Sequence, residues 1–289
     1  MLKQRLVTAL ILSLLCIAAV VLLPMWWFEL LAALIVVVLG AWEWARLAGF
    51  PAFWQRLCYT IASGLLLLWL HNAPELSALG QDIPVLLTLG VLWWCLALVL
   101  VLSYPASAGF WRCSWLRLLM GWLVLLPAWA GLVALAHLES AGGIADEGRV
   151  WLFYLFALVW GSDAGAYFAG KRFGKRRLSP QVSPGKTWEG VLGSMVVTGA
   201  LATGVAWYAD MPWPLWPILV AISWLICLVA VLGDLLESMF KREQGFKDSG
   251  SVLPGHGGLL DRIDSLTAAA PVFASLCLLL EAPCWSCIQ

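Results

Sequence analysis

The sequence predicts an all-α fold, that of a polytopic integral membrane protein with about nine transmembrane helices. Of its 289 residues, 62% are hydrophobic and only 12% are charged, whereas roughly a quarter of the residues of a soluble domain carry charge. Its 20 tryptophans fit the same class, because indole favours the boundary between lipid headgroups and hydrocarbon. Composition therefore excludes an ordinary soluble domain.

Apolar runs close to the spanning length of roughly 20 residues mark the expected helices in order. They cover residues 6–23, 27–45, 57–71, 84–103, 117–137, 150–169, 190–208, 215–236 and 265–281, and the third is the shortest. The first run resembles a signal peptide in its basic start, but its length and the lack of a small-residue cleavage pattern favour a retained helix.

The basic residues give the expected orientation. All of them except Arg149 fall in loops on one side of the predicted spans. The positive-inside rule then places the N-terminus in the cytoplasm and the C-terminus outside. Residues 1–150 are expected to form a transmembrane scaffold of about five helices, in which Glu29 and Glu43 lie near helix ends and reach water. Because the ionisable groups that could do chemistry concentrate between residues 160 and 265, we expect residues 151–289 to form a catalytic region of about four helices with two cytoplasmic active-site segments.

The first candidate segment is "GSDAGAYFAGKRFGKRRL", residues 161–178. Asp163 falls inside a predicted span, where an unpaired charge costs roughly 2.5 to 3.5 kcal/mol at mid-helix, so it needs a partner. Gly161, Gly165 and Ala169 are spaced by four and predict close helix packing. Tyr167 follows Asp163 by one turn on the same side. The basic residues that follow are also typical of a positive-inside stop signal.

The second segment is "SPGKTWEG", residues 183–190. Ser183 is expected to cap a helix whose first residue is Pro184, and the free N–H groups there would bind an anion beside Lys186 and Thr187. A plain helix cap explains the same residues. A Walker A loop is rejected, because its first glycine would fall at Pro180 and no strand precedes it.

The third segment begins with "GDLLESMFKR", residues 233–242. Asp234, Glu237, Ser238 and Lys241 occur at i, i+3, i+4 and i+7, so they share one face of a helix that enters the cytoplasm. The segment continues through a glycine-rich loop to "LLDRIDS", residues 259–265.

That second part carries two carboxylates one turn apart and a histidine. Asp261 and Asp264 open the last predicted span, where Asp264 has the alternative role of N-cap. Carboxylates at two helix ends beside lysines suit Mg²⁺ held against phosphates. His256 either contacts a phosphate, transfers a proton or is structural. A membrane transporter is an alternative for carboxylates in spans, but these groups are biased to one face.

Residues 238–264, "SMFKREQGFKDSGSVLPGHGGLLDRID", closely resemble the signature of phosphatidate cytidylyltransferases, or CDP-diacylglycerol synthases: S-x-x-K-R-x4-K-D, then H-G-G-x-x-D-R-x-D. The sequence shows no departure from it. The segments "SDAGAYFAGKRFGK", "SPGKTWEG" and "GDLLES" are also similar to that family. The resemblance in motif covers residues 160–265, and the rest of the chain is similar in hydropathy alone.

The resemblance implies an Mg²⁺-dependent reaction of CTP with phosphatidate that yields CDP-diacylglycerol and pyrophosphate. It also implies a second, monovalent cation such as K⁺, a homodimer, contact with membrane lipids, and an active site that faces the cytoplasm from a bacterial inner membrane. No nucleic-acid partner is expected. Transfer to another lipid phosphate remains an alternative, because the motifs handle nucleotide and phosphate rather than lipid tails.

The resemblance also implies roles for individual residues. Metal binding is assigned to Asp234, Asp261 and Asp264. The catalytic set comprises Asp234, Lys241, Arg242, Lys247, Asp248, His256, Asp261, Arg262 and Asp264. The substrate-binding set comprises Asp163, Tyr167, Ser183, Lys186, Thr187, Glu237 and Ser238.

Overall fold

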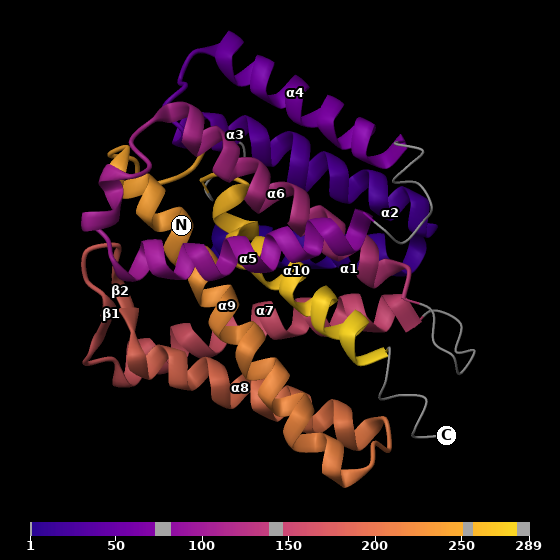
Figure 1. Cartoon of the computed structure of the whole chain (residues 1–289). Helices are drawn as coiled ribbons and strands as arrows, with labels where there is room; N and C mark the ends of the chain where they lie inside the picture. Colours follow the sequence, from indigo (N-terminus) through magenta and orange to yellow (C-terminus); the bar gives the residue numbers. More distant parts are fainter. Residues whose placement is uncertain (1, 73–81, 139–146, 251–256, 282–289) are drawn as a thin grey trace.

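The computed structural model describes residues 2–72, 82–138, 147–250 and 257–281. Long helices make up most of these ranges and pack into one bundle (Figure 1). They are α1 (Leu2–Leu22), α4 (Phe53–Asn72), α5 (Asp82–Leu102), α6 (Ser114–Ala136), α7 (Glu147–Phe173), α8 (Trp188–Tyr208), α9 (Trp216–Glu243), α10 (Leu260–Glu281), and a continuous rod of α2 (Met25–Ala32), the π-helix η1 (Ala33–Leu39) and α3 (Gly40–Leu47). Short 3₁₀ turns, η2 (Ala106–Gly109) and η3 (Trp213–Leu215), precede α6 and α9.

Seven helical segments of the described chain are long and apolar enough to cross a membrane. They are Met25–Leu47, Pro84–Leu102, Ser114–Ala136, Gly148–Phe173, Trp188–Tyr208, Trp213–Glu243 and Leu260–Leu280. Helix α1 contributes a shorter apolar stretch, Ser13–Leu22, and α4 is not among the seven. The helical, polytopic class is confirmed, whereas the number of spans and the orientation of the termini stay predictions.

Helix α6 is the centre of the bundle. About 83% of its apolar window is buried in the protein, against 33 to 56% for the other candidate spans. Two hydrogen bonds fix its first turns to the N-terminal helices: Trp44 Nε1 donates to the Arg117 carbonyl at 2.7 Å, and the Tyr59 hydroxyl donates to the Leu118 carbonyl at 2.8 Å. These bonds connect α3 and α4 to the core.

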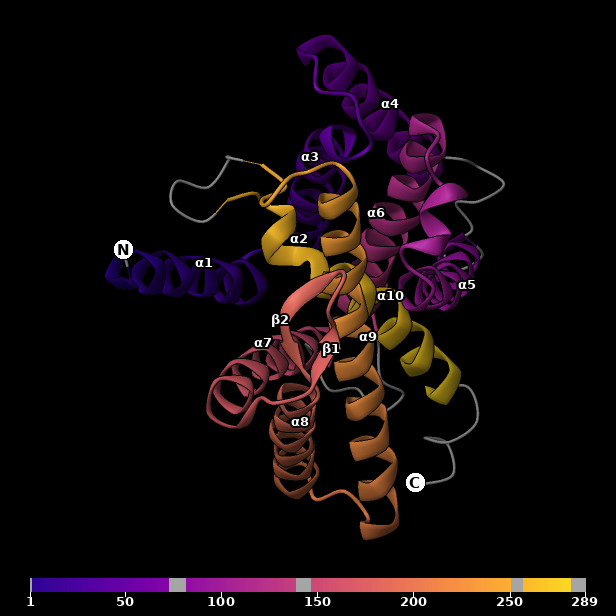
Figure 2. The same cartoon turned by 90° about the vertical axis from the view of Figure 1, so that its left-hand side faces the viewer.

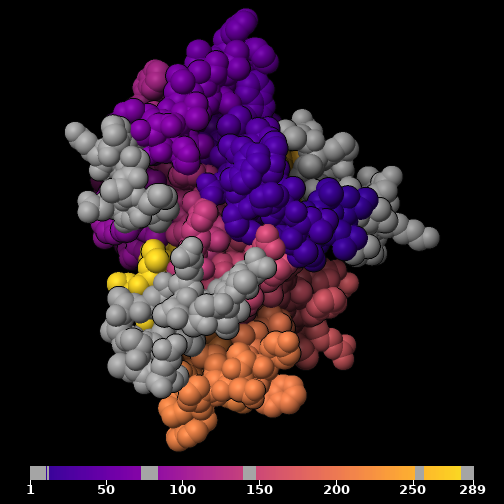
Figure 3. Space-filling view, turned by 90° about the vertical axis from the view of Figure 1, so that its right-hand side faces the viewer, coloured from indigo at the N-terminus to yellow at the C-terminus, as the bar shows by residue number. Residues whose placement is uncertain are grey.

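Helix α10 joins the two halves of the chain. It packs against α5 and α6 of the first half and against α7 and α9 of the second, as Figures 1 and 2 both show. In Figure 3 the N-terminal helices (indigo to purple) cover the upper part of one face and the α8–α9 turn (orange) covers the lower end. The charged segments of the second half therefore belong to a bundle whose core comes from both halves.

A small β-hairpin connects α7 to α8 and lies beside α9 (Figure 2). Its strands β1 (Arg177–Ser179) and β2 (Ser183–Thr187) pair antiparallel, with Arg177 opposite Thr187. The predicted helix start at Ser183 and Pro184 is therefore wrong, because both residues lie in a strand. Thr187 has an extended φ of −131° and is the real N-cap of α8, accepting a hydrogen bond from Gly190 N at 3.1 Å.

The predicted close packing of the α7 small-residue stripe is confirmed. A Cβ at Gly161 would meet Leu201 Cδ1 of α8 at 2.8 Å. A Cβ at Gly165 would meet the backbone oxygen of Gly193 at 2.7 Å, and the Ala169 methyl group lies against Gly193 itself. Small side chains thus let the α7 and α8 backbones touch.

We expect Gly165→Ala to destabilise the protein by about 1 to 3 kcal/mol, the usual cost of overpacking, because the α8 backbone blocks the added methyl group. The matched control is Gly204→Ala in α8, where a Cβ meets nothing within 4 Å. That control should be neutral or slightly stabilising, since alanine is the better helix former. Thermal unfolding in detergent measures both, and equal midpoints for the two variants would contradict the packing.

Candidate active site

Two segments far apart in the sequence meet at one end of the bundle. From the hairpin, Lys186 Nζ lies 2.8 Å from Asp234 Oδ2 of α9 and donates to the Val231 carbonyl at 3.3 Å. From α9, Arg242 Nε donates to the Val182 carbonyl of the hairpin turn at 3.2 Å. The structure therefore brings the second and third candidate segments together.

The polar face predicted for α9 is confirmed. The Ser238 hydroxyl donates to Asp234 Oδ1 at 3.1 Å, and Lys241 Nζ lies 3.3 Å from Glu237 Oε2. Each pair is four residues apart, the spacing at which helical side chains meet. This face is turned into the protein, since Glu237 and Ser238 are buried.

An ion pair joins α9 to α10. Lys241 Nζ lies 2.6 Å from Asp261 Oδ1, and both side chains are only 11% exposed. The other oxygen, Asp261 Oδ2, accepts from Ser249 N at 3.0 Å, from the Ser249 hydroxyl at 3.1 Å and from Gly258 N at 2.8 Å. Both oxygens of Asp261 are thus held in a fixed direction.

Three carboxylates from three helices lie within electrostatic range of one another. Asp163 of α7 interacts with Asp234 of α9 and with Asp264 of α10, and with the cations of Lys186 and Arg262. Asp163 therefore has the charged partners that its place in a span demanded. We refer to Asp163, Lys186, Asp234, Glu237, Lys241, Asp261, Arg262 and Asp264 as the charged cluster.

Part of the charged cluster fits a divalent cation. Glu237 is nearly fully buried, no donor group of the described residues reaches its Oε1, and its carboxylate lies within hydrogen-bonding range of the Asp264 carboxylate. Two such carboxylates side by side require a cation or a shared proton. Across the residues that the structure describes, no three carboxylate, imidazole or thiolate groups form a ready-made metal site. An ion that keeps waters and takes ligands from a substrate suits this arrangement.

The other predicted residues that the structure describes are not members of the charged cluster. Tyr167 is exposed, and its hydroxyl accepts from Lys171 Nζ at 3.5 Å. The predicted position on the same side of the helix as Asp163 therefore does not place Tyr167 in the charged cluster. Lys247 and Asp248 are exposed on the loop after α9. Ser183 lies in β2 and Thr187 caps α8, as described above. His256 lies outside the described residues.

The alternative interpretation of Asp264 as the N-cap of the last helix is wrong. Helix α10 begins at Leu260, so Asp264 lies in its second turn, where its carboxylate accepts from Ser265 N at 2.8 Å. The start of α10 is held instead by Glu43, whose carboxylate accepts from Leu260 N at 2.8 Å. The expectation that Glu43 reaches water is also wrong, since its exposure is 0%.

Sequence reasoning missed three residues that organise this region: Glu43, Ser249 and Glu189. Glu189 accepts from the backbone N–H groups of Lys175 at 3.0 Å and Arg176 at 3.2 Å, and so fixes the turn between α7 and the hairpin. One signal was available for Glu43, because a carboxylate inside a predicted span needs a partner. Ser249 carries no such signal.

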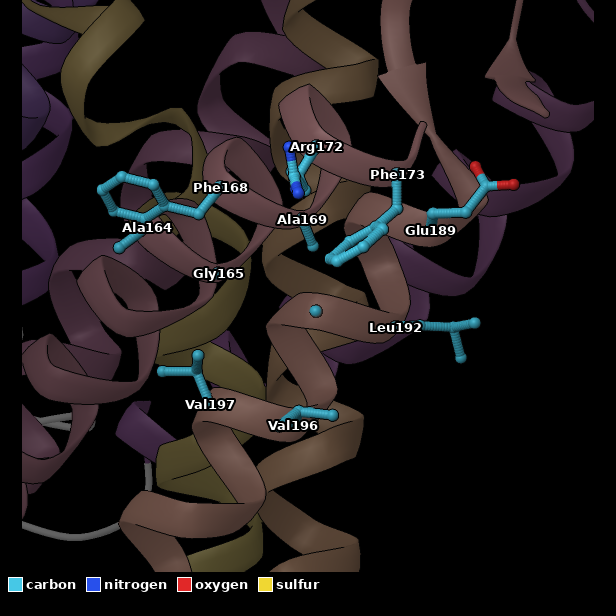
Figure 4. A pocket seen from close by; sticks show the side chains of 11 residues that line it. Ala164, Gly165, Phe168, Ala169, Arg172, Phe173, Glu189, Leu192, Val196 and Val197 are labelled. Carbon is cyan, nitrogen blue, oxygen red and sulfur yellow. The ribbon is translucent and has the colours of Figure 1, made fainter. Parts of the chain in front are cut away.

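A groove of about 760 Å³ lies between α7 and α8. Figure 4 shows Phe168, Leu192 and Val196 along it, with Arg172 and Glu189 nearer one end. Its lining includes no member of the charged cluster. The groove is mainly apolar, as expected for a helix surface in contact with lipid, and the chemistry is better placed at the charged cluster.

The charged cluster lies at the end of an apolar helix bundle and combines five carboxylates with three cationic side chains. The chain belongs to the Cytidylyltransferase family, whose model matches residues 3–280. This membership excludes the transporter alternative and confirms the resemblance drawn from the motifs.

Curated relatives narrow the class. The chain is 48% identical over 276 residues to a protein of Pseudomonas aeruginosa named phosphatidate cytidylyltransferase. That alignment covers 96% of this chain and 97% of the relative. A Haemophilus influenzae protein of the same name is 42% identical over 289 residues, with 95% of this chain and 98% of the relative covered. One from Bacillus subtilis is 40% identical over 152 residues, 53% of this chain and 56% of the relative.

We expect Lys241→Met to lower the free energy of unfolding by about 3 to 5 kcal/mol, because it leaves the carboxylates of Asp261 and Glu237 in a buried site without their shared cation. The control, Lys171→Met, changes an exposed lysine and should stay within about 0.5 kcal/mol. Denaturant unfolding in detergent measures both.

The double variant Lys241→Met with Glu237→Gln should recover part of that loss, because it removes one of the two unpaired charges. A Lys241→Met protein as stable as the wild type would show that the ion pairs of Lys241 do not hold α9 to α10.

Proposed function

We propose that the protein is a phosphatidate cytidylyltransferase, which converts CTP and phosphatidate to CDP-diacylglycerol and pyrophosphate. The observation that carries the proposal is the similarity, over nearly the whole chain, to the two relatives of that name. The charged cluster supports it, because both substrates are anions and one of them is a lipid.

The reaction needs little general-base catalysis. A phosphate oxygen of phosphatidate is already anionic and attacks the α-phosphorus of CTP, and the bond from that phosphorus to the bridging oxygen breaks as pyrophosphate leaves. The protein must bring two anions together and stabilise the charge that builds on the leaving group. A cluster of fixed cations and carboxylates supplies both functions.

Lysine and arginine side chains would contact the phosphates. Lys186 from β2 and Lys241 from α9 reach the charged cluster from two different segments, and Arg262 of α10 interacts with Asp163 beside them. Because carboxylates hold these cations in place, they are oriented before substrate arrives. Arg242 also bonds to the hairpin turn and thereby positions Lys186. The exposed Lys247 is proposed to meet phosphate groups from the loop.

We propose Mg²⁺ as the divalent cation, bound by Asp234 and Asp264, with Glu237 beside them. The buried Glu237 oxygen next to Asp264, which no donor group of the described residues reaches, supports this choice, and carboxylate oxygens are the ligands that Mg²⁺ prefers. Bound there, the ion would supply positive charge to the triphosphate. Asp261, whose oxygens are engaged by Lys241 and by backbone N–H groups, would join the metal only when Lys241 turns towards a phosphate.

We place the active site at the cytoplasmic face of a bacterial inner membrane, with the N-terminus in the cytoplasm. The ends of α7, α8 and α9 that carry basic loops gather around the hairpin, the Lys241–Asp261 ion pair joins the start of α10 to that end of α9, and basic loops favour the cytoplasm. The relatives come from bacteria. The monovalent cation, such as K⁺, and the homodimer remain predictions that rest on the family resemblance.

The direct test is an assay of purified protein in detergent with Mg²⁺, labelled CTP and phosphatidate. We expect equal amounts of CDP-diacylglycerol and pyrophosphate, because each transfer releases one of each. Omitting Mg²⁺ is the control and should abolish product. Product with a different lipid phosphate, and none with phosphatidate, would shift the assignment to that lipid.

A second test replaces Asp261 by Asn. We expect turnover to fall below detection while the protein stays folded, because the neutral amide no longer holds the Lys241 ammonium group. The matched control is Asp210→Asn in the α8–α9 turn, where the residue has a positive φ of 48° that asparagine also tolerates. The control should keep wild-type turnover, and an unaffected Asp261→Asn rate would remove Asp261 from the catalytic set.

A further inference from the structure

Glu43 is a fully buried carboxylate in the half of the chain that carries none of the signature residues. It lies in α3, and its exposure is 0%. Glu43 Oε1 accepts from Leu259 N at 2.9 Å, and Glu43 Oε2 accepts from Leu260 N at 2.8 Å and from the Ser249 hydroxyl at 2.9 Å. A buried carboxylate with three donors is satisfied without a salt bridge.

These donors belong to the start of α10 and to the loop that precedes it. The first N–H groups of a helix have no partner within the helix, and a negative charge is favoured there. Glu43 therefore caps α10 from another helix. Gly250 and Gly258 allow the approach, because a Cβ at either position would collide with the Glu43 carboxylate.

The Ser249 hydroxyl connects this cap to the charged cluster. It lies 2.9 Å from Glu43 Oε2 and 3.1 Å from Asp261 Oδ2, so its single proton is shared between two carboxylates. Ser249 N and Gly258 N donate to the same Asp261 oxygen. The backbone that orients Asp261 is thus the backbone that Glu43 holds.

Helix α3 holds the loop at a second point. Arg46, one turn after Glu43, lies with its guanidinium 4.3 Å from the centre of the Phe246 ring, and its Nη1 donates to the Ser249 carbonyl at 3.5 Å. The loop after α9 is therefore attached to the N-terminal half through both its backbone and an aromatic side chain.

We propose that Glu43 is a positioning residue for the transfer reaction: through Ser249 and the first turn of α10, it fixes the direction in which Asp261 presents its carboxylate to Lys241. This inference rests on the proposed cytidylyltransferase function for its kinetic consequence. Glu43 acts on Asp261 through Ser249, whose hydroxyl contacts both carboxylates. We therefore expect Glu43 to affect the rate of transfer rather than the binding of CTP or phosphatidate.

The test compares Glu43→Gln and Glu43→Asp with Glu29→Gln, a glutamate in the same helical rod that pairs with His137 instead. We expect Glu43→Gln to lower kcat by about 10- to 100-fold, the scale of a small misplacement of catalytic groups, with little change in either KM. Glu43→Asp keeps the charge and should restore part of kcat. Glu29→Gln should leave kcat unchanged.

Hydrogen exchange gives a readout that does not need activity. In Glu43→Gln the amides of Leu259 and Leu260 should exchange about 10-fold faster, since they lose a charged acceptor, and Glu29→Gln should leave them unchanged. Faster exchange with wild-type kcat would make Glu43 merely structural and overturn the proposal, as would a lower kcat with unchanged exchange.

Two further outcomes are distinguishable. If the wild type transfers no cytidylyl group to any lipid phosphate, the proposed function fails, and the exchange rates alone decide whether Glu43 holds the start of α10. If Glu43→Gln does not fold, Ser249→Ala breaks the bridge to Asp261 without altering Glu43. It should reproduce the loss of kcat at unchanged KM, and a wild-type kcat in that variant overturns the proposal.

Discussion

The charged cluster depends on one constraint: a carboxylate in a membrane helix bundle must have a compensating charge or a full set of donors. Asp261 satisfies it with Lys241 on one oxygen and backbone N–H groups on the other. Asp234 satisfies it with Lys186. The Lys241–Asp261 ion pair joins α9 to α10, and the Lys186–Asp234 ion pair joins the hairpin to α9. The ion pairs that neutralise the buried charges therefore also hold the elements of the site together.

Such pairing requires that helix backbones approach more closely than large side chains allow. Gly165 brings α7 onto α8, and Gly233 brings α9 onto α10, where a Cβ would collide with the Asp264 carbonyl and approach Ala268 Cβ to 3.0 Å. The distance between neighbouring carboxylates is set by these contacts. Close helix packing thus brings Asp163, Asp234 and Asp264 near enough to interact electrostatically. The small residues are therefore as necessary for that interaction as the carboxylates are.

The parts that could be predicted from the sequence are those governed by local periodicity. Hydropathy located the helices, and the 3.6-residue repeat placed Glu237 and Lys241 on one face. The hairpin was missed because Ser183 and Pro184 are also typical of a helix start, and strand pairing depends on a partner segment. The Glu43 contact joins Ser249 across 206 residues, a separation at which no local pattern carries information. Tyr167 had the right spacing, yet its side chain turns outward.

The pairing of Lys186 with Asp234 and of Lys241 with Asp261 affects how an anionic substrate would bind. A lysine held by a carboxylate pays little to exchange that partner for a phosphate, because one charged acceptor replaces another and the ammonium group is never left bare. The carboxylate released in the exchange then needs a cation of its own, and the divalent ion proposed beside Asp234 and Asp264 would meet that need. Binding of nucleotide and of metal would therefore favour each other. In the proposed role of Glu43, its hydrogen bonds to Ser249 and to the start of α10 would hold the backbone behind Asp261 in place while Lys241 changes partner.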